Sequence, residues 1–478
     1  MKPANLLFIM SDQHARDITG CYGNDVVKTP NMDALAARGT RFDYAYTNSP
    51  ICVPARAGLA TGRYIHQIRC WDSAQPYYGQ FASWGHRLME AGHRAVSIGK
   101  LHYRSSEDEN GFHEEILPIH VHKRIGWAKC LLRKEWQEYP EGVEYAHRTG
   151  PGESPYTHHD RNVCAQACEW IEQEAPRYTD KPWVLYVGFV SPHNPFMAPK
   201  PFYNLYSPDK IPPPRQHGLE APVLHPPVAA IKDFFNYDSH FDEERVKIAK
   251  TGYFGLCSFL DDNIGKIMMT IEKAGLSENT RIVYTSDHGD CLGNRGIWAK
   301  SVMYEESVAI PMIMAGPDIP EDKAVSTPVS LVDGYPTIIE GAGERLSQEE
   351  QALPGESLIE IAQGNFRNDK VVFSEYHDGG SITGTFMIRT GRWKYVYHVG
   401  YSPQLFDLDS DPLERKDLGM DPAYGEVLSQ CDAKLREIVD PEIANEMAFN
   451  DQHQKIEELG GIEAIKSYEV FDFTPVPE

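Results

Sequence analysis

The sequence contains no run of 18 apolar residues, the length that a membrane-spanning helix requires. An apolar stretch near its start, Leu6–Met10, is too short for the core of a signal peptide, and Ser11 and Asp12 follow it at once. We expect this stretch to be a buried strand. The two absences together predict a cytoplasmic protein with no membrane partner.

Basic residues are few compared with acidic ones. Lys and Arg number 46, Asp and Glu number 69, and the formal net charge is −23. A surface this acidic repels nucleic acid and anionic membranes, so neither is expected as a partner. It also repels anionic substrates, and a site for an anion must therefore gather positive charge locally.

Cysteine is also scarce, with nine in 478 residues, an odd number too sparse for a disulfide framework. We expect most of these thiols to be reduced and buried. Cys164 and Cys168 lie four apart on a predicted helix, but no second pair completes a zinc site. Internal repeats and low-complexity tracts are absent as well. The hydrophobic fraction of 41% is that of an ordinary globular protein, and the length suggests two or three domains.

The first two-thirds of the chain alternates short apolar strands with helical patterns. Strands are predicted over residues 5–11, 95–99, 183–190, 281–286 and 310–315. Because each strand is apolar on both faces, the pattern indicates an α/β fold with a mostly parallel sheet between two layers of helices. Long helices are expected over residues 161–173 and 243–274.

A different pattern begins near Gln363. Short turns join three predicted strands, which indicates a small antiparallel sheet, and a helix follows over residues 427–439. The three strands cover residues 371–376, 385–390 and 393–398. We therefore predict a catalytic α/β domain of residues 1–365. A smaller C-terminal α+β subdomain of residues 366–478 is expected to end in an extended tail.

Four predicted strands stop at a chemically active side chain. The side chains at these ends are Asp12 and Gln13, Lys100 and His102, His193, and Asp287 and His288. In open α/β sheets the ligand crevice lies at the carboxyl ends of the strands. One such end is easily a mere turn, but four ends occupied in this way predict one shared site.

The residue types in this set suit different tasks. Asp12 and Asp287 are carboxylates for a hard divalent cation, to which an amide oxygen or a ring nitrogen can be added. Lys100 and Lys300 are point charges for a tetrahedral oxyanion. The latter follows closely on the Asp287 loop. The histidines of the set can move protons near neutral pH.

The most specific signal is the run Cys52-Val53-Pro54-Ala55-Arg56. A chance match to Cys-x-Pro-x-Arg is expected about 0.06 times in a chain of this composition. Pro54 suits the first turn of a helix, which places Cys52 at a helix N-terminus, where an anion is favoured. The simplest interpretation of a thiol in that position is a nucleophile with a lowered pKa.

This run, followed by Leu59-Ala60-Thr61-Gly62-Arg63, resembles the signature of the type I sulfatases of the alkaline phosphatase superfamily. The resemblance extends from Asn5 to Leu408 and is nearest to bacterial arylsulfatase-like and choline-sulfatase-like members. It implies an alkaline-phosphatase-like fold and a sulfuric ester hydrolase. It also implies that a formylglycine-generating or sulfatase-maturing enzyme converts Cys52 to formylglycine.

The resemblance further implies one divalent metal ion, with Ca²⁺ as the first candidate and Mn²⁺ or Mg²⁺ as alternatives. The implied ligands are Asp12, Gln13, Cys52 in its modified form, Asp287 and His288. The implied catalytic residues are Cys52, Arg56, Lys100, His102, His193 and Lys300. Arg56 is implied to steady the aldehyde hydrate, and the two lysines to bind the sulfate. The two histidines are implied to accept and donate protons. Many sulfatases have two adjacent aspartates where this chain has Asp12-Gln13. The glutamine version resembles choline sulfatases and phosphonate monoester hydrolases.

The expected substrate is a small-molecule sulfate ester, aryl or small alkyl. Two alternatives remain: a phosphonate monoester or phosphodiester hydrolase on the same scaffold, and a non-catalytic oxyanion-binding protein with an unmodified Cys52. Trp71, Trp127 and Glu375 could bind a cationic group through ring faces and a carboxylate. The alternative for the two tryptophans is that they are packing residues.

The tail, Tyr468–Glu478, carries Tyr468, Val470, Phe471 and Phe473 with no evident core partner. Exposed aromatic residues of this kind mark interaction sites, and a tail can pass between subunits at little cost. We therefore predict a subunit contact and a homodimer or tetramer. The alternative is that the tail docks on its own chain.

Overall fold

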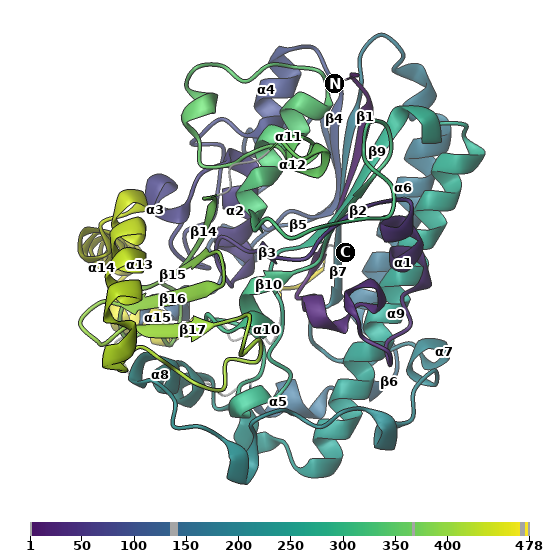
Figure 1. Cartoon of the computed structure of the whole chain (residues 1–478). Coiled ribbons are helices and arrows are strands. Elements are labelled where there is room, and N and C mark those ends of the chain that lie inside the picture. The colour runs from purple at the N-terminus through teal and green to yellow at the C-terminus, as the bar shows by residue number, and fades with distance from the viewer. Residues whose placement is uncertain (1, 134–141, 366–368, 469–473, 477–478) are drawn as a thin grey trace.

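A computed structural model describes residues 2–133, 142–365, 369–468 and 474–476 (Figure 1). Its centre is an eight-stranded sheet in the order β12-β2-β11-β9-β1-β7-β4-β5. The strands are β1 (Asn5–Asp12), β2 (Gly39–Phe42), β4 (Ala95–Lys100), β5 (Glu114–Ile119), β7 (Val184–Pro192), β9 (Thr280–Ser286), β11 (Met312–Ala315) and β12 (Lys323–Val325). The five strands from β9 to β5 are parallel, whereas β11 runs antiparallel to both of its neighbours.

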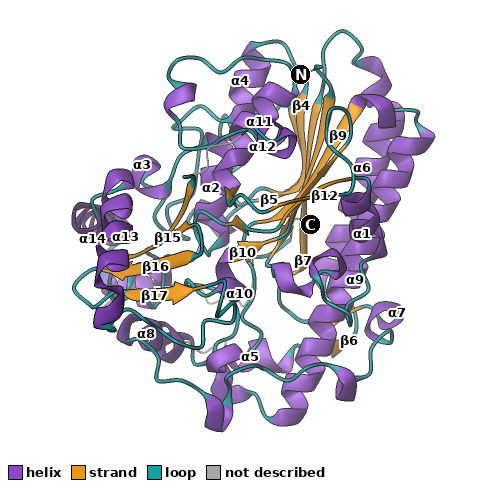
Figure 2. Ribbon diagram, viewed as in Figure 1, coloured by secondary structure: helices purple, strands orange, loops and turns teal. Residues whose placement is uncertain are grey.

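Helices cover both faces of this sheet (Figure 2). On one face lie α1 (Pro30–Ala37), α6 (Pro155–Gln173) and α9 (Glu243–Lys273). On the other lie α2 (Cys52–Thr61), α4 (Trp84–Glu90), α11 (Gly334–Gly341) and α12 (Leu358–Gln363). Strand β1 shows why two layers form. Leu6 and Phe8 pack into one core, and Leu7 and Ile9 into the other, because alternate side chains of a strand point to opposite faces. The predicted fold class is confirmed.

One predicted strand differs in the structure. Residues 310–315 form not one strand but two, β10 (Ala309–Ile310) and β11, which belong to different sheets. The residue between them is Pro311, which has no N–H to donate to a ladder and so ends the pairing.

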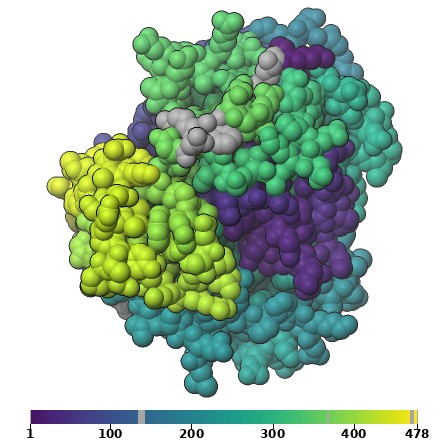
Figure 3. Space-filling model, in the orientation of Figure 1, coloured from purple at the N-terminus to yellow at the C-terminus, as the bar shows by residue number. Residues whose placement is uncertain are grey.

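The C-terminal part is a four-stranded antiparallel sheet with helices against it. It comprises β14 (Val371–Tyr376), β15 (Thr385–Thr390), β16 (Trp393–His398), β17 (Gln404–Asp407), α13 (Gly425–Ile438), α14 (Pro441–Glu458) and α15 (Ile462–Lys466). The three strands predicted from the sequence are confirmed, and β17 adds a fourth. In Figure 3 this part, green to yellow, lies directly against the purple N-terminal part. The predicted domain boundary at 365/366 falls at a segment, 366–368, outside the described residues.

The remaining elements are short. They are β3 (Ala45–Tyr46), β6 (Gly150–Pro151), β8 (Met197–Ala198), β13 (Val329–Ser330), α3 (Ile65–Ile68), α5 (Gly142–His147), α7 (Lys200–Tyr203), α8 (Pro226–Phe235) and α10 (Glu305–Val308). All nine cysteines are free thiols. Within the described ranges, no helix combines the length and the apolarity needed to cross a membrane.

Candidate active site

Four neighbouring strands carry the residues that the sequence placed at strand ends. In the sheet, β9, β1, β7 and β4 follow one another and run parallel, so their carboxyl ends meet at one edge. Helix α2 begins at Cys52 beside this edge, and Cys52 Sγ lies 3.6 Å from Asp12 Oδ1 and 3.1 Å from His288 Nε2. The structure therefore brings the predicted strand-end residues and Cys52 together.

The backbone at this edge holds several residues in the left-handed region, which is costly for any residue other than glycine. Gln13 has φ 67°, His102 φ 59°, Ala299 φ 62° and Ser301 φ 81°. Hydrogen bonds hold the first two: Gln13 N donates to Asp287 Oδ1 at 3.1 Å, and His102 N donates to the carbonyl of Ile119 at 2.8 Å. These two bonds hold the backbone in place and so aim the side chains of Gln13 and His102.

Asp12, Cys52, Asp287 and His288 form a buried cluster in which one ligand atom of each lies within 4.8 Å of all the others. His288 Nδ1 donates to the carbonyl of Gly289 at 3.0 Å, which leaves Nε2 facing the cluster. Burial lowers the pKa of His288 to about 4, so the ring is neutral and able to ligate. Burial alone would raise the pKa of Asp12, but nearby Lys100 and other cationic groups hold it well below its usual range. Two carboxylates and a neutral imidazole fit a divalent cation.

The side-chain amide of Gln13 is hydrogen-bonded through both its nitrogen and its oxygen. Its Nε2 donates to Asp290 Oδ2 at 2.5 Å, and its Oε1 accepts from Lys300 Nζ at 2.5 Å. Asp290 is a buried carboxylate that the sequence interpretation passed over, although it lies only three residues after Asp287. Burial raises its pKa to about 6. Asp290 thus fixes the amide of Gln13 at the edge of the cluster.

Arg56 is a buried cation that joins the two carboxylates. Its Nε donates to Asp287 Oδ2 at 2.9 Å, and one terminal nitrogen lies 3.4 Å from Asp12 Oδ2. The other terminal nitrogen donates to the carbonyl of Lys100 at 2.8 Å and to Tyr186 Oη at 3.0 Å. With all these donors engaged, Arg56 orients Asp12 and Asp287 from behind.

The thiol of Cys52 is not activated in the way that a helix N-terminus alone suggests. Burial is the main cause that raises the pKa of this thiol, to about 12, and the nearby Asp12 carboxylate is the second. Lys300 and Lys100 act in the opposite direction but do not outweigh these effects. The expectation of a lowered pKa, made from the helix position, is therefore wrong for the unmodified side chain.

A chain of contacts connects Lys300 to the end of β7. Lys300 Nζ lies 3.0 Å from His193 Nε2, while His193 Nδ1 lies 2.7 Å from the carbonyl of Asn194. A carbonyl only accepts, so Nδ1 carries the ring proton and Nε2 accepts from the ammonium of Lys300. Burial and Lys300 keep the pKa of His193 well below its usual value. On the opposite side, Lys100 Nζ lies 2.5 Å from Asp12 Oδ2.

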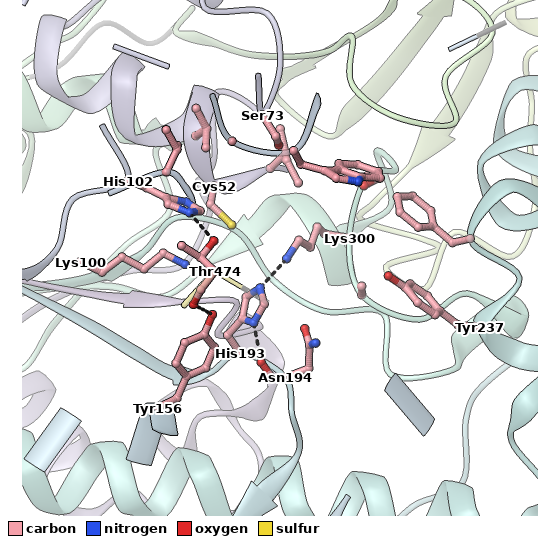
Figure 4. A pocket seen from close by; sticks show the side chains of 18 residues that line it. Cys52, Ser73, Lys100, His102, Tyr156, His193, Asn194, Tyr237, Lys300 and Thr474 are labelled. Atoms are coloured by element: carbon pink, nitrogen blue, oxygen red, sulfur yellow. Dashed lines mark hydrogen bonds between the residues drawn. The ribbon is translucent and has the colours of Figure 1, made fainter. Parts of the chain in front are cut away.

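A cavity reaches Cys52 of the buried cluster (Figure 4). Cys52, Lys100, His102, His193 and Lys300 line it. Three further lining residues, Trp127, Phe235 and Tyr237, form what we call the aromatic wall. The rings of Trp127 and Phe235 stack with centroids 6.0 Å apart, and those of Phe235 and Tyr237 stack with centroids 5.3 Å apart. The sequence interpretation missed Ser73, Tyr156, Asn194, Phe235, Tyr237 and Thr474, which also line the cavity.

The predicted cation pocket of Trp71, Trp127 and Glu375 does not form, because only Trp127 lines the cavity. Trp71 is buried in the core against β14 and β15, and its indole N–H donates to Asp451 at 2.7 Å. Glu375 is fully buried on β14 and is bonded to His66 and His377. No carboxylate is found among the described residues that line the cavity.

We expect Glu375→Gln to weaken the fold and leave the Michaelis constant unchanged. Burial works against ionisation of Glu375, but His66 and His377 outweigh it and lower its pKa from 4.5 to about 2. Losing a buried charged acceptor should reduce the free energy of unfolding by about 1–3 kcal/mol at neutral pH. A carboxyl group whose pKa is lower in the folded state stabilises the fold at pH values above its unfolded pKa. The difference in free energy of unfolding should therefore shrink as the pH falls from about 4.5 towards 2. Denaturant unfolding at several pH values measures it, and a raised Michaelis constant at unchanged stability would contradict it.

Comparisons with known proteins identify the family of this chain. The sulfatase family profile matches residues 4–344, and a profile described as N-sulphoglucosamine sulphohydrolase, C-terminal, matches residues 293–440. A choline-sulfatase of Rhizobium meliloti strain 1021 is 32% identical over 431 residues, covering 87% of this chain and 83% of its own. Arylsulfatase K of Bos taurus is 32% identical over 464 residues, covering 91% and 81%.

Solved structures show the same fold. The phosphonate monoester hydrolase of Agrobacterium radiobacter superposes with a TM-score of 0.72 at 21% identity, covering 91% of this chain and 95% of its own. BT4656, solved in complex with its substrate D-glucosamine-2-N,6-O-disulfate, gives a TM-score of 0.72 at 20% identity, covering 94% and 99%. The chain therefore belongs to the sulfatase family. It is a hydrolase of sulfuric esters, as the resemblance in its sequence implied.

Proposed function

We propose that Cys52 is converted to formylglycine by a maturing enzyme and works beside one divalent cation, for which Ca²⁺ is our first assignment and Mn²⁺ or Mg²⁺ the alternatives. The observation that carries this proposal is the buried cluster of Cys52, Asp12, Asp287 and His288. The proposed ligands are Asp12, Gln13, the modified residue 52, Asp287 and His288. When bound, the cation and the aldehyde hydrate supply a polarised sulfuryl group and an oxygen nucleophile.

The remaining residues of the chain would bind and orient the ester. Lys100 and Lys300 line the cavity and would supply positive charge for the sulfuryl oxygens. Asp287 accepts a proton at its carboxylate, and Arg56 holds that carboxylate in place. Burial and Lys100 keep the pKa of His102 well below its usual value, so its ring is neutral, and we assign it the role of proton acceptor. His193 would protonate the leaving oxygen from Nε2, the nitrogen that accepts from Lys300 Nζ, and Lys300 would supply that proton.

We further propose that the leaving group carries a ring, so that an aryl sulfate fits better than a quaternary ammonium sulfate. The aromatic wall of Trp127, Phe235 and Tyr237 offers faces on which a ring can stack. Such faces also attract a quaternary ammonium group, but Lys100 and Lys300 line the same cavity, and the described lining adds no carboxylate to offset their charge. Phosphonate monoesters or phosphodiesters are a second candidate substrate class beside sulfate esters, favoured by Gln13 in place of a third carboxylate. Assays of aryl sulfates, alkyl sulfates and phosphonate esters side by side decide between them.

His193→Ala should reveal its role through the leaving group. Loss of a proton donor matters most when the leaving group is poor, so we expect about a hundredfold loss of kcat/KM on alkyl sulfates and less than about tenfold on nitrophenyl sulfate. Lys100→Ala should lose similarly on both, because the charge on the sulfuryl group is common to both. Equal sensitivity of the His193 variant to the two substrates would assign the proton donor to Lys300.

A further inference from the structure

The described end of the tail, Thr474–Val476, lies against the active site of its own chain. Val476 packs with Ile119, Tyr156 and Val190, and Thr474 lines the cavity. This docking is the alternative to the subunit contact expected from the sequence. Of the aromatic and apolar residues on which that expectation rested, Val470, Phe471 and Phe473 lie outside the described residues. Tyr468 packs in its own chain with Ile456 and Ile465 among others.

Thr474 makes two hydrogen bonds inside the site (Figure 4). Its Oγ1 lies 2.9 Å from His102 Nε2, and its carbonyl accepts from Tyr156 Oη at 2.9 Å. Tyr156 belongs to α6, and its ring meets that of His193 edge-on with centroids 5.9 Å apart. Thr474 therefore contacts His102, beyond the end of β4, directly. It is linked to His193, beyond the end of β7, through Tyr156.

The imidazole of His102 depends on this contact for its orientation. Its backbone is held in the left-handed region by the bond to Ile119, which fixes Cβ but leaves the ring free to turn. Its Nδ1 is buried and has no hydrogen-bond partner in the part of the chain that the structure describes. The hydroxyl of Thr474 is thus the one described group that hydrogen-bonds this ring. A hydroxyl can accept the Nε2 proton, and Nδ1 is then left with a free lone pair.

We propose that Thr474 is a positioning residue of the active site, whose hydroxyl accepts the Nε2 proton of His102 and so leaves Nδ1 as the proton-accepting nitrogen. The inference rests on the proposed function for the role of His102 as a base. It makes the end of the chain part of the catalytic site. Thr474 and His102, which this bond joins, lie more than 370 residues apart in the sequence.

The matched pair Thr474→Val and Thr474→Ser tests the proposal on the mature enzyme. Valine keeps the shape and removes the hydroxyl, so kcat should fall about 10- to 100-fold with little change in the Michaelis constant, as for other groups that orient a catalytic ring. Serine restores the hydroxyl and should regain most of the lost kcat. A chain ending at residue 473 should resemble the valine variant. A rise in kcat on truncation would overturn the proposal and make the tail an obstruction.

A second measurement reads the tautomer itself. In ¹⁵N-histidine-labelled protein, the His102 signals are assigned by their loss in His102→Asn. We expect a protonated Nε2 and an unprotonated Nδ1 in the wild type and the serine variant, and a mixture in the valine variant. Unchanged tautomer and kcat in Thr474→Val, alongside a strong loss in His102→Ala, would overturn the tail's role alone. Full activity of His102→Ala would instead overturn the role proposed for the base.

Discussion

Cys52→Ala is expected to lower kcat/KM by at least about three orders of magnitude, because nucleophilic and metal-assisted contributions are lost together. The fold should be kept. The side chain is small and buried at the start of α2, and alanine fills the same backbone position without a new polar group. Steady-state kinetics on an aryl sulfate and thermal unfolding of the same preparation measure the two parts of this expectation.

The matched control is Cys431→Ala, a buried cysteine on α13 far from the strand ends, which should keep full activity. Intact mass gives an independent check of the wild type, since formylglycine is lighter than cysteine by about 18 Da. A wild type at the unmodified mass with no turnover would favour the oxyanion-binding alternative. An active Cys52→Ala variant would refute the proposed nucleophile.

The sequence predicted which of these residues come together at the candidate site, because the carboxyl ends of neighbouring parallel strands converge. Asp12, Lys100, His193 and Asp287 were found by that rule, and Cys52 by its motif. The helix start at Cys52 was also predicted, but the pKa of its thiol was not. The dipole of a helix is visible in a sequence, whereas complete burial beside two carboxylates appears only once the chain is folded.

The substrate pocket was beyond this kind of reasoning. Glu375 and Trp71 were predicted to bind a cation. In the structure both are buried at the C-terminal sheet and hydrogen-bonded there. Phe235 and Tyr237 come from α8 and the turn after it, within a long segment that no strand periodicity orders. Thr474 reaches the site from the end of the chain. Contacts of such long sequence separation leave no local pattern to detect.

Asp287→Asn is expected to remove metal and activity together, with kcat/KM falling at least about a hundredfold. Asp287 is one of only two carboxylates in the cluster, and an amide in its place has no charge to offer a divalent cation. Elemental analysis of the purified protein should show about one divalent ion per chain in the wild type and a clear deficit in the variant. The exposed Asp409→Asn serves as the control for loss of a carboxylate elsewhere.

The Asp287→Asn variant also distinguishes metal ligation by this carboxylate from its structural hydrogen bonding. Asp287 Oδ2 accepts from Arg56 Nε, and Oδ1 accepts from the backbone N–H groups of Gln13 and His288. Asparagine keeps one acceptor oxygen and loses the charge, so a purely structural role would lower stability and leave the metal content of the folded protein intact. Excess metal should restore part of the activity if ligation is the main loss. An active wild type that contains no divalent metal would contradict the proposed centre, and two zinc ions per chain would assign the site to phosphatase-like chemistry instead.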